Sequence, residues 1–207
     1  MYPAAFQSAQ LTIRIWATAL IVVFGAAGVF VGGEALGPHG GSGAVYSYNV
    51  TFMNMTDSLP GASGQAPQRT TTEVEVTVTG SNITAVVFII SYVDNTVSPI
   101  FNPAVTATIT GPNGTGTETG SVPAGGAEIT VAVPNEKPAN QTLEADSEAD
   151  ALAIAAGNST DPMLGTGSWT VSLNVGSPLG GIFRPSASIT YTIDIEVEYF
   201  VGSATRV

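Results

Sequence analysis

Cysteine is absent from the sequence, histidine occurs once and lysine plus arginine number only 5. The lack of cysteine excludes disulfides, thiolate nucleophiles and cysteine-ligated zinc or iron–sulfur sites. Nucleic-acid binding needs clustered basic side chains that neutralise phosphates. The few basic residues are scattered among 16 acidic ones, and the formal net charge is −11. We therefore expect no nucleic-acid partner.

Residues for catalysis or metal binding are equally scarce. The single histidine, His39, lies in a glycine-rich stretch, where nothing would hold it rigidly between a nucleophile and a carboxylate. One run of alternate acidic residues could offer oxygens to calcium: Glu144, Asp146, Glu148 and Asp150. On a helix, however, alternate side chains point about 200° apart, so these carboxylates would not converge on one ion. We expect no enzymatic activity, no metal and no cofactor, although paired carboxylates of a glycoside hydrolase stay open as an alternative.

One long stretch near the N-terminus carries no charge. Residues 15–33 would form a helix of about 28 Å, close to the roughly 30 Å thickness of bilayer hydrocarbon. Arg14 precedes the stretch and Glu34 follows it, which favours a cytoplasmic N-terminus and an extracellular C-terminal part. We expect residues 1–36 to form a single-pass membrane helix that contacts lipid through residues 11–33.

A cleavable signal peptide is the alternative for this segment. Such peptides have a basic start, an apolar stretch of 7–15 residues and a small-x-small cleavage site. Here one arginine is present, the stretch is longer, and Gly33-Glu34-Ala35 makes a poor site. We therefore favour a retained anchor.

Beyond the anchor, the pattern predicts an all-β domain. A glycine-rich tether, residues 37–43, leads into a domain over residues 44–207. Short segments with alternating polar and apolar residues are separated by Gly, Pro and Asn turns, as is typical of antiparallel strands with one wet face. These segments are Val45–Met53, Glu73–Thr79, Ile83–Val93, Ala104–Thr110, Ala127–Val133, Ser168–Val175 and Ile189–Tyr199. They predict an antiparallel β-sandwich or jelly roll of about seven to nine strands.

Two further segments complete the expected domain. Glu144–Ala156 is the one stretch that reads as a helix, with acids at its N-terminal end, where the helix dipole favours them, and Gly157 after it. Asp57–Thr72 is polar and rich in Gly and Pro, so we expect a long loop there.

Acceptor motifs for N-linked glycans are numerous. Of the 10 asparagines, six stand in an N-x-S/T motif, and all six follow the apolar stretch. They are Asn49, Asn54, Asn82, Asn113, Asn140 and Asn158. Because the charge bias also places this part of the chain outside the cell, we expect N-linked glycans at several of them.

Three strand-like segments resemble a known family. Residues 86–93, then VTATITGPNGT at 105–115 and GSWTVSLNV at 167–175, are similar to the jelly-roll P-domain appended to subtilisin-type proteases and to pre-peptidase surface modules. The resemblance implies a sandwich with Trp169 in its core, and it implies no catalysis, since in that family the chemistry resides in another domain. Ser91-Tyr92 replaces the family's usual His-Thr pair.

The sequence thus predicts a membrane-anchored, extracellular, glycosylated domain that makes structural or recognition contacts. We expect protein partners or self-assembly, with the chain as an accessory subunit of a larger surface or membrane assembly. The overall layout also resembles archaeal surface glycoproteins and pilins. The alternative is therefore a subunit of a pilus-like filament, with the N-terminal helix in the filament core, although the basic residues of a pilin processing site are missing at Ser8-Ala9-Gln10. A secreted hydrolase or carbohydrate-binding module is a third reading.

Overall fold

The computed structural model describes residues 44–95, 103–112, 115–157, 161–176 and 188–207. They belong to one compact unit, Gly43–Val207. The membrane helix expected over residues 11–33 lies outside the described residues. Within them, no helix combines the length and the apolar character that a membrane crossing requires.

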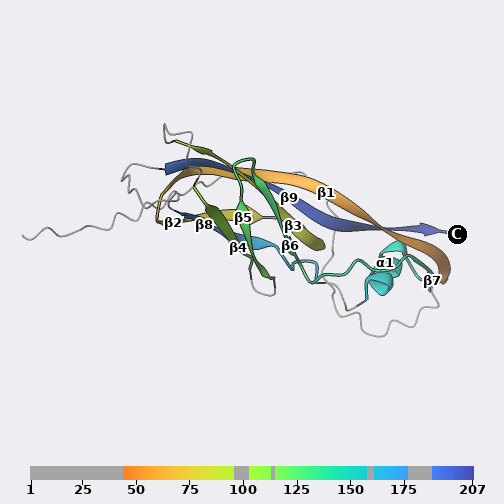
Figure 1. The fold of residues 1–207 in the computed structure, drawn as a ribbon. Coiled ribbons are helices and arrows are strands. Elements are labelled where there is room, and N and C mark those ends of the chain that lie inside the picture. Colours follow the sequence, from red (N-terminus) through yellow and green to blue (C-terminus); the bar gives the residue numbers. More distant parts are fainter. Residues whose placement is uncertain (1–43, 96–102, 113–114, 158–160, 177–187) are drawn as a thin grey trace, which may run out of the picture. The chain divides into compact units, whose positions relative to one another are not determined.

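Two antiparallel sheets build the domain (Figure 1). The five-stranded sheet has the order β6 (Ala127–Ala132), β3 (Ile83–Asp94), β9 (Ser188–Arg206), β1 (Tyr46–Pro67) and β7 (Gln141–Ala145). The four-stranded sheet has the order β2 (Thr71–Val78), β8 (Gly167–Val175), β4 (Val105–Thr110) and β5 (Thr117–Val122). One short helix, α1, spans Glu148–Ala156. The predicted all-β sandwich with a single short helix is confirmed for these residues.

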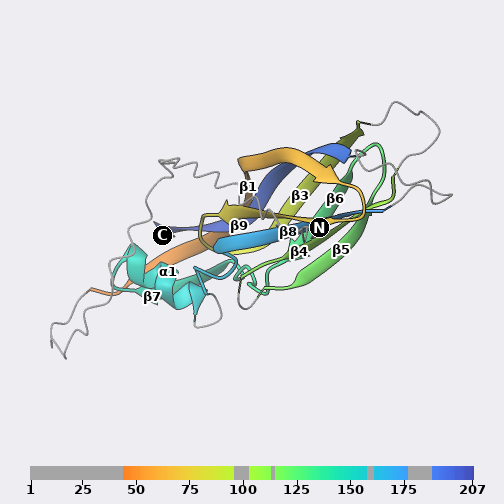
Figure 2. The same ribbon diagram turned by 90° about the vertical axis from the view of Figure 1, so that its left-hand side faces the viewer.

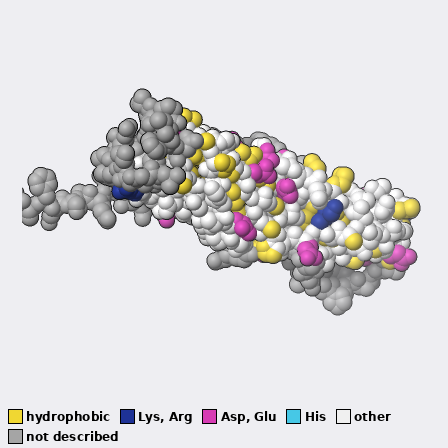
Figure 3. Space-filling view, in the orientation of Figure 1, with side chains coloured by type: hydrophobic (Ala, Val, Ile, Leu, Met, Phe, Trp, Pro, Cys, Tyr) yellow, Lys and Arg dark blue, Asp and Glu magenta, His cyan; other side chains and the backbone are white. Residues whose placement is uncertain are grey.

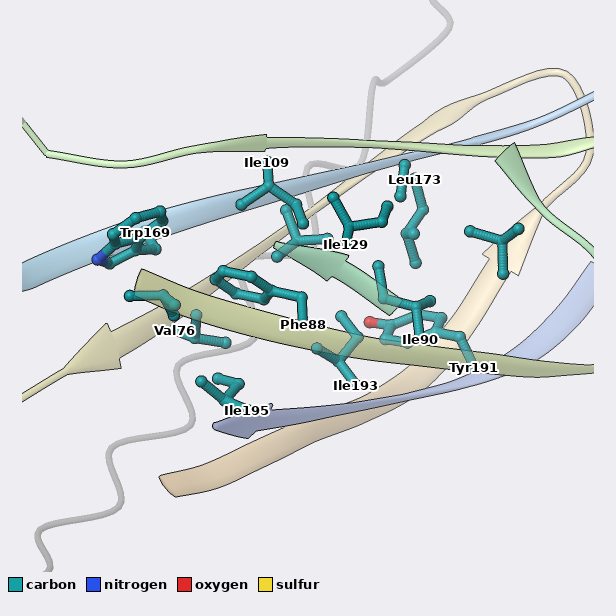
Figure 4. Packing of buried hydrophobic residues seen from close by; sticks show 14 of the residues in the cluster. Val76, Phe88, Ile90, Ile109, Ile129, Trp169, Leu173, Tyr191, Ile193 and Ile195 are labelled. Carbon is teal, nitrogen blue, oxygen red and sulfur yellow. The ribbon is translucent and has the colours of Figure 1, made fainter. Parts of the chain in front are cut away.

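The main core lies between the two sheets. Alternate residues of each strand point inward, so β9 contributes Ile189, Tyr191, Ile193, Ile195 and Val197 from one face. Trp169 of β8 is completely buried against Phe88 of β3, with ring centroids 5.6 Å apart (Figure 4). The indole N–H donates to the Gly165 carbonyl oxygen at 2.9 Å, which satisfies its one polar group. Trp169 therefore lies in the core between the two sheets.

The first and last strands form a long ribbon that reaches beyond this sandwich. Their antiparallel pairing runs from Tyr48 opposite Arg206 to Pro67 opposite Ser188. Figures 1 and 2 both show β7 and α1 at the end of this ribbon that is away from β2, β4, β5 and β8. The guanidinium carbon of Arg206 lies 3.3 Å from the centre of the Tyr46 ring, which ties the two strand ends together.

A second, smaller core forms around α1. It buries Tyr48, Val50 and Phe52 of β1 and Phe200 of β9 against Ala145, Ala151 and Ala155. On β9 the buried face changes: the odd-numbered residues are buried up to Val197, whereas beyond it Phe200 is buried and Val201 is exposed. The two cores therefore use opposite faces of one continuous ribbon.

The expected loop over Asp57–Thr72 is wrong, because β1 continues through most of it. The strand reaches Pro67, with a bulge between Leu59 and Ala62. Two of the glycines that suggested a loop are required by packing against β9. A Cβ at Gly64 would lie 2.6 Å from the hydroxyl oxygen of Tyr191, and one at Gly61 would collide with the carbonyl oxygen of Ile193.

The expected helix over Glu144–Ala156 begins later than predicted. Residues 141–145 form β7, which pairs with the start of β1. Ser147 then caps α1: its Oγ accepts from the Asp150 N–H at 3.1 Å. The short strands β5 and β7 were both missed by the sequence pattern, since neither combines a clear alternation with large apolar residues.

Truncation of Trp169 tests the main core. We expect Trp169→Ala to lower the free energy of unfolding by about 3–5 kcal/mol, because it opens a cavity and removes the bond to Gly165. Urea unfolding followed by circular dichroism measures the change. The exposed residue Thr77 of the edge strand β2 supplies the control, and Thr77→Ser should change the free energy by no more than about 0.5 kcal/mol. Equal effects of the two variants would contradict the assigned packing.

Candidate interaction surface

An exposed apolar patch lies on the free face of the β1–β9 ribbon. Met53 is 58% exposed, Met55 44% and Val201 44%. Met53 is opposite Val201 and Met55 is opposite Tyr199 in the ladder, and cross-strand partners share a face. We call Met53, Met55, Tyr199 and Val201 the ribbon patch.

The ribbon patch follows from the change of buried face described above. Phe52 and Phe200 point toward α1, with their rings packed edge to face at 6.0 Å. Their neighbours in sequence, Met53 and Val201, must then point the other way, because successive side chains of a strand alternate. The main sandwich covers that face of β9 only as far as Val197. Four large side chains are left outside both cores.

A hydrogen bond fixes one side of the ribbon patch. The Tyr199 hydroxyl donates to Asp57 Oδ2 at 2.9 Å. This bond, with smaller contributions from burial and from the charge of Asp57, raises the pKa of Tyr199. Burial likewise raises the pKa of Tyr92 and Tyr191. All three phenols are therefore protonated at neutral pH.

One edge of β1 is open beside the patch. Strand β7 pairs only with residues 46–50 of β1. The next outward-pointing group, the Phe52 N–H, donates to Asn140 Oδ1 at 2.7 Å. From Met53 onward no described strand pairs with this edge. An unpaired edge is a template for strand addition.

Three of the predicted glycan acceptors lie at the same end of the ribbon. Asn49 and Asn54 of β1 and Asn140, just before β7, are all exposed. At Asn140 the bond to Phe52 uses Oδ1, so Nδ2, the atom that would carry a glycan, is left available. Asn113 and Asn158 lie outside the described residues.

Asn82 differs from these acceptors because the fold uses it. Its backbone takes a positive φ of 56° in the turn before β3, a conformation that asparagine tolerates better than most residues. Its N–H donates to the Pro162 carbonyl at 3.0 Å, and its Nδ2 donates to the Phe200 carbonyl at 3.5 Å. The Asn82 side chain is half-buried and its Nδ2 is already bonded. We therefore assign Asn82 a structural role in the turn.

The acidic run does not converge on a metal site. Glu144 lies on β7, and the Asp150 carboxylate accepts a 2.7 Å bond from the Ser147 hydroxyl at the helix cap. Across the described ranges, no group of three or more histidine, cysteine, aspartate or glutamate side chains could hold a metal ion. His39 lies outside these ranges.

The remaining surface is rich in uncharged hydroxyl groups. On the four-stranded sheet, Thr108 of β4 and Thr119 of β5 share a 3.0 Å hydrogen bond. On the side of the molecule in Figure 3, acidic and basic side chains form only small, separate groups. The chain's negative charge is thus spread thinly over the part in view.

The ribbon patch and the open edge were not anticipated from the sequence. The alternation of Val45–Met53 predicted a strand but gave no reason for Met53 and Met55 to remain exposed. The signal was Phe200-Val201, where two adjacent apolar residues follow a strict alternation. Such a pair means that both faces of the strand carry apolar side chains, and only one of them could belong to the sandwich core.

A comparison with protein-family models finds no matching family, and a search of the curated proteins finds no similar chain.

The Tyr199–Asp57 bond predicts a dependence on alkaline pH. A raised pKa in the folded state means that the stability is fully present below the unfolded pKa of about 10 and is lost as pH rises through the folded value. We expect the difference in unfolding free energy between wild type and Tyr199→Phe to be constant up to about pH 9 and to shrink above about pH 10. Denaturant titrations at several pH values measure it. A difference that stays constant to pH 12 would contradict the bond.

Exposure and bonding together predict which acceptors carry glycans. We expect occupancy at Asn49, Asn54 and Asn140, and little or none at Asn82, because its Nδ2 is half-buried and bonded. Glycopeptide mass spectrometry of the chain from its native source measures each site. Thr142→Val should abolish the modification of Asn140, whereas Thr142→Ser, which keeps the motif, should retain it. Occupancy at Asn82 equal to that at Asn49 would sink this assignment.

Proposed function

We propose that the chain is a membrane-anchored extracellular glycoprotein whose β-sandwich domain makes structural or recognition contacts in a larger surface or membrane assembly. The ribbon patch is the observation that carries the proposal. Methionine and valine side chains exposed side by side cost free energy in water, and grouped apolar exposure marks interaction sites. An apolar patch on a surface that is otherwise hydroxyl-rich and acidic suits contact with another protein.

The strand order supports the assignment to jelly-roll surface modules. Without β7, the two sheets read β1-β9-β3-β6 and β2-β8-β4-β5. The first strand pairs with the last and the second with the next to last, which is the order of two interlocked Greek keys. Such modules present contacts on sheet faces, edges and loops, which agrees with a patch and an open edge at the surface.

The place of the ribbon patch in the sequence fits an anchored domain. Only residues 34–45 separate the apolar stretch from the start of β1. Fully extended, such a connection spans at most about 40 Å. An anchor at residues 11–33 would therefore keep the beginning of β1 within reach of neighbouring membrane proteins. The proposal includes no catalytic role; a chain without cysteine and with one histidine in a glycine-rich stretch has few candidates for a nucleophile–base pair.

The open edge of β1 favours the second candidate, a subunit of a surface filament. Repeating contacts between identical copies are what a filament needs, and an unpaired strand edge provides one such contact. In that case the N-terminal helix would pack against its copies in the filament core and would not remain in lipid. The two candidates therefore differ in where the helix resides.

The intact mass of the chain isolated from native membranes tests the anchor. We expect the full 207 residues plus glycan increments, in a fraction that alkaline carbonate does not release. Loss of about 10 N-terminal residues together with fibres in electron micrographs would favour the filament. Loss of about 35 residues and recovery from the medium would show a secreted domain and overturn the proposal.

Substitution in the ribbon patch tests the contact itself. We expect the double variant Met53→Thr/Val201→Thr to lose the proteins that co-purify with the wild-type chain in mild detergent, because the apolar contact is removed. The matched control is Val93→Thr on β3, where the side chain is 68% exposed but lies outside the patch. Equal loss of co-purifying proteins in both variants, or no loss in either, would contradict a role for the patch.

A further inference from the structure

We propose that Met53 and Met55 form an oxidation-sensitive modification site, at which a peroxide converts both thioethers to sulfoxides and makes the ribbon patch polar. The modification acts on the contact that the patch makes and leaves the fold intact. The inference deepens the proposed function by naming a regulation of its interaction surface, and it rests on that function for its biological role.

Methionine has an unusual distribution in this domain. Three of the chain's four methionines lie in the described residues, and all three are exposed: Met53 at 58%, Met55 at 44% and Met163 at 62%. Methionine ordinarily fills gaps in apolar cores. In the described residues, both cores consist of aliphatic and aromatic side chains and include no methionine. The thioethers of this part of the chain are therefore all at its surface.

The two methionines of β1 are successive side chains on one face of the strand. Their Cα atoms are about 7 Å apart along it. Thr51 precedes them on that face and Asp57 follows, and both of these are polar. Exposed strand positions favour β-branched and aromatic residues, so strand formation does not explain two methionines here. Oxidation of both would change one continuous piece of surface.

The composition of the chain directs an oxidant to these sulfur atoms. Thiolates and thioethers are the side chains that peroxides oxidise most readily, and exposure favours their reaction. The chain has no cysteine, so no thiol of its own competes for the oxidant. For the same reason, a reductant that repairs the methionines has to come from outside the chain.

The reaction needs only the peroxide. The sulfur lone pair attacks one oxygen of hydrogen peroxide, so an S–O bond forms and the O–O bond breaks. Sulfur gives up two electrons, and the second oxygen leaves as water with both peroxide protons. Methionine sulfoxide reductases reverse the change. In that step the sulfoxide oxygen leaves as water, while two thiols of the reductant are oxidised to a disulfide.

Oxidation would make two of the four side chains of the ribbon patch polar. A sulfoxide that a partner covers without a hydrogen-bond donor is an unsatisfied polar group, and each such group weakens the contact about tenfold or more. In the free chain the sulfoxides stay in water, because Met53 and Met55 lie outside both cores. A covered patch is shielded from the oxidant, so the oxidant acts on the free chain and prevents its association.

Peptide mapping by mass spectrometry tests the site without any partner. The full-length chain in mild detergent is treated with hydrogen peroxide and digested, and one added oxygen is scored at each methionine. We expect Met53 and Met55 to be oxidised at rates similar to that of the exposed Met163, with no change in the urea midpoint of unfolding. Reduced Met53 and Met55 in a chain whose Met163 is oxidised, or a lowered midpoint, would overturn the proposal.

Capture from a cell extract tests the effect on the contact. Tagged chains are treated with peroxide or left untreated, freed of peroxide by catalase, and incubated with unoxidised extract in mild detergent. We expect oxidation to lower the amount of protein that the wild-type chain captures at least about tenfold. Treatment of the oxidised chain with sulfoxide reductases and dithiothreitol should restore the capture.

Two leucine variants show which sulfur atoms are responsible, each compared with its own untreated sample. Met53→Leu/Met55→Leu keeps apolar side chains of similar volume without sulfur, so peroxide should leave its capture unchanged. The matched control Met163→Leu should lose capture as the wild type does. Equal losses in the wild type and in Met53→Leu/Met55→Leu, or no loss in the wild type, would overturn the regulation. If the double leucine variant folds poorly, reversal by the reductases in the wild type decides.

Failure of the proposed function gives a different result. The untreated wild-type chain would then capture no more protein than Met53→Thr/Val201→Thr does. That result would refute the contact and its regulation together, and the peptide map would still decide whether Met53 and Met55 are an oxidation site. Capture that is present before peroxide and unchanged after it refutes the regulation alone.

Discussion

The antiparallel pairing of β1 with β9 is the constraint on which the rest of the domain depends. It joins the beginning of the domain to its end, from Tyr48 and Arg206 to Pro67 and Ser188. Every other element of the five-stranded sheet is attached to one of these two strands directly or through β3. Because residues far apart in sequence must meet before the pairing gains any free energy, the entropy of loop closure weighs heavily on folding. The sheet cannot assemble from local hairpins alone.

The β1–β9 ribbon contributes to two cores because one of its faces is buried along one half and the opposite face along the other half. The sandwich takes the face that carries Ile193 and Ile195, and the small core around α1 takes the opposite face, with Phe52 and Phe200. Close approach at the second core depends on Gly202, where a Cβ would lie 2.8 Å from the Phe52 ring and 2.9 Å from Leu152. Each core leaves the reverse side of its half of the ribbon uncovered. The ribbon patch is the apolar part of that uncovered surface, so its exposure is a consequence of the architecture.

The central strands could be predicted because their polar and apolar residues alternate strictly. The short strands and the segment rich in small residues could not be predicted in this way. Ile189–Val197 and Val74–Val78 repeat apolar residues at every second position, so both their strand character and their buried face could be predicted. The stretch from Pro60 to Ala66 reads as a loop because Gly, Ala and Pro dominate it. Its small size is set by Tyr191 and the Ile193 carbonyl on the neighbouring strand, which no local pattern reveals. The acceptor motifs could be found in the sequence, but the difference between Asn82 and Asn140 arises from tertiary hydrogen bonds.

Asn140 has two roles at the edge of the sheet: it bonds the β1 backbone, and it is a predicted glycan acceptor. Among the described residues, the buried side chains are apolar or aromatic except for Asn135, so the interior offers contacts for packing and little for recognition. Contacts with other molecules must then be made by the sheet faces and by the strand edges, where backbone N–H and C=O groups can form hydrogen bonds. The side-chain Oδ1 of Asn140 accepts a hydrogen bond from the Phe52 N–H at the edge of β1, while Nδ2 is available for a glycan. Because the Phe52 N–H is already bonded, the unpaired part of this edge among the described residues begins at Met53.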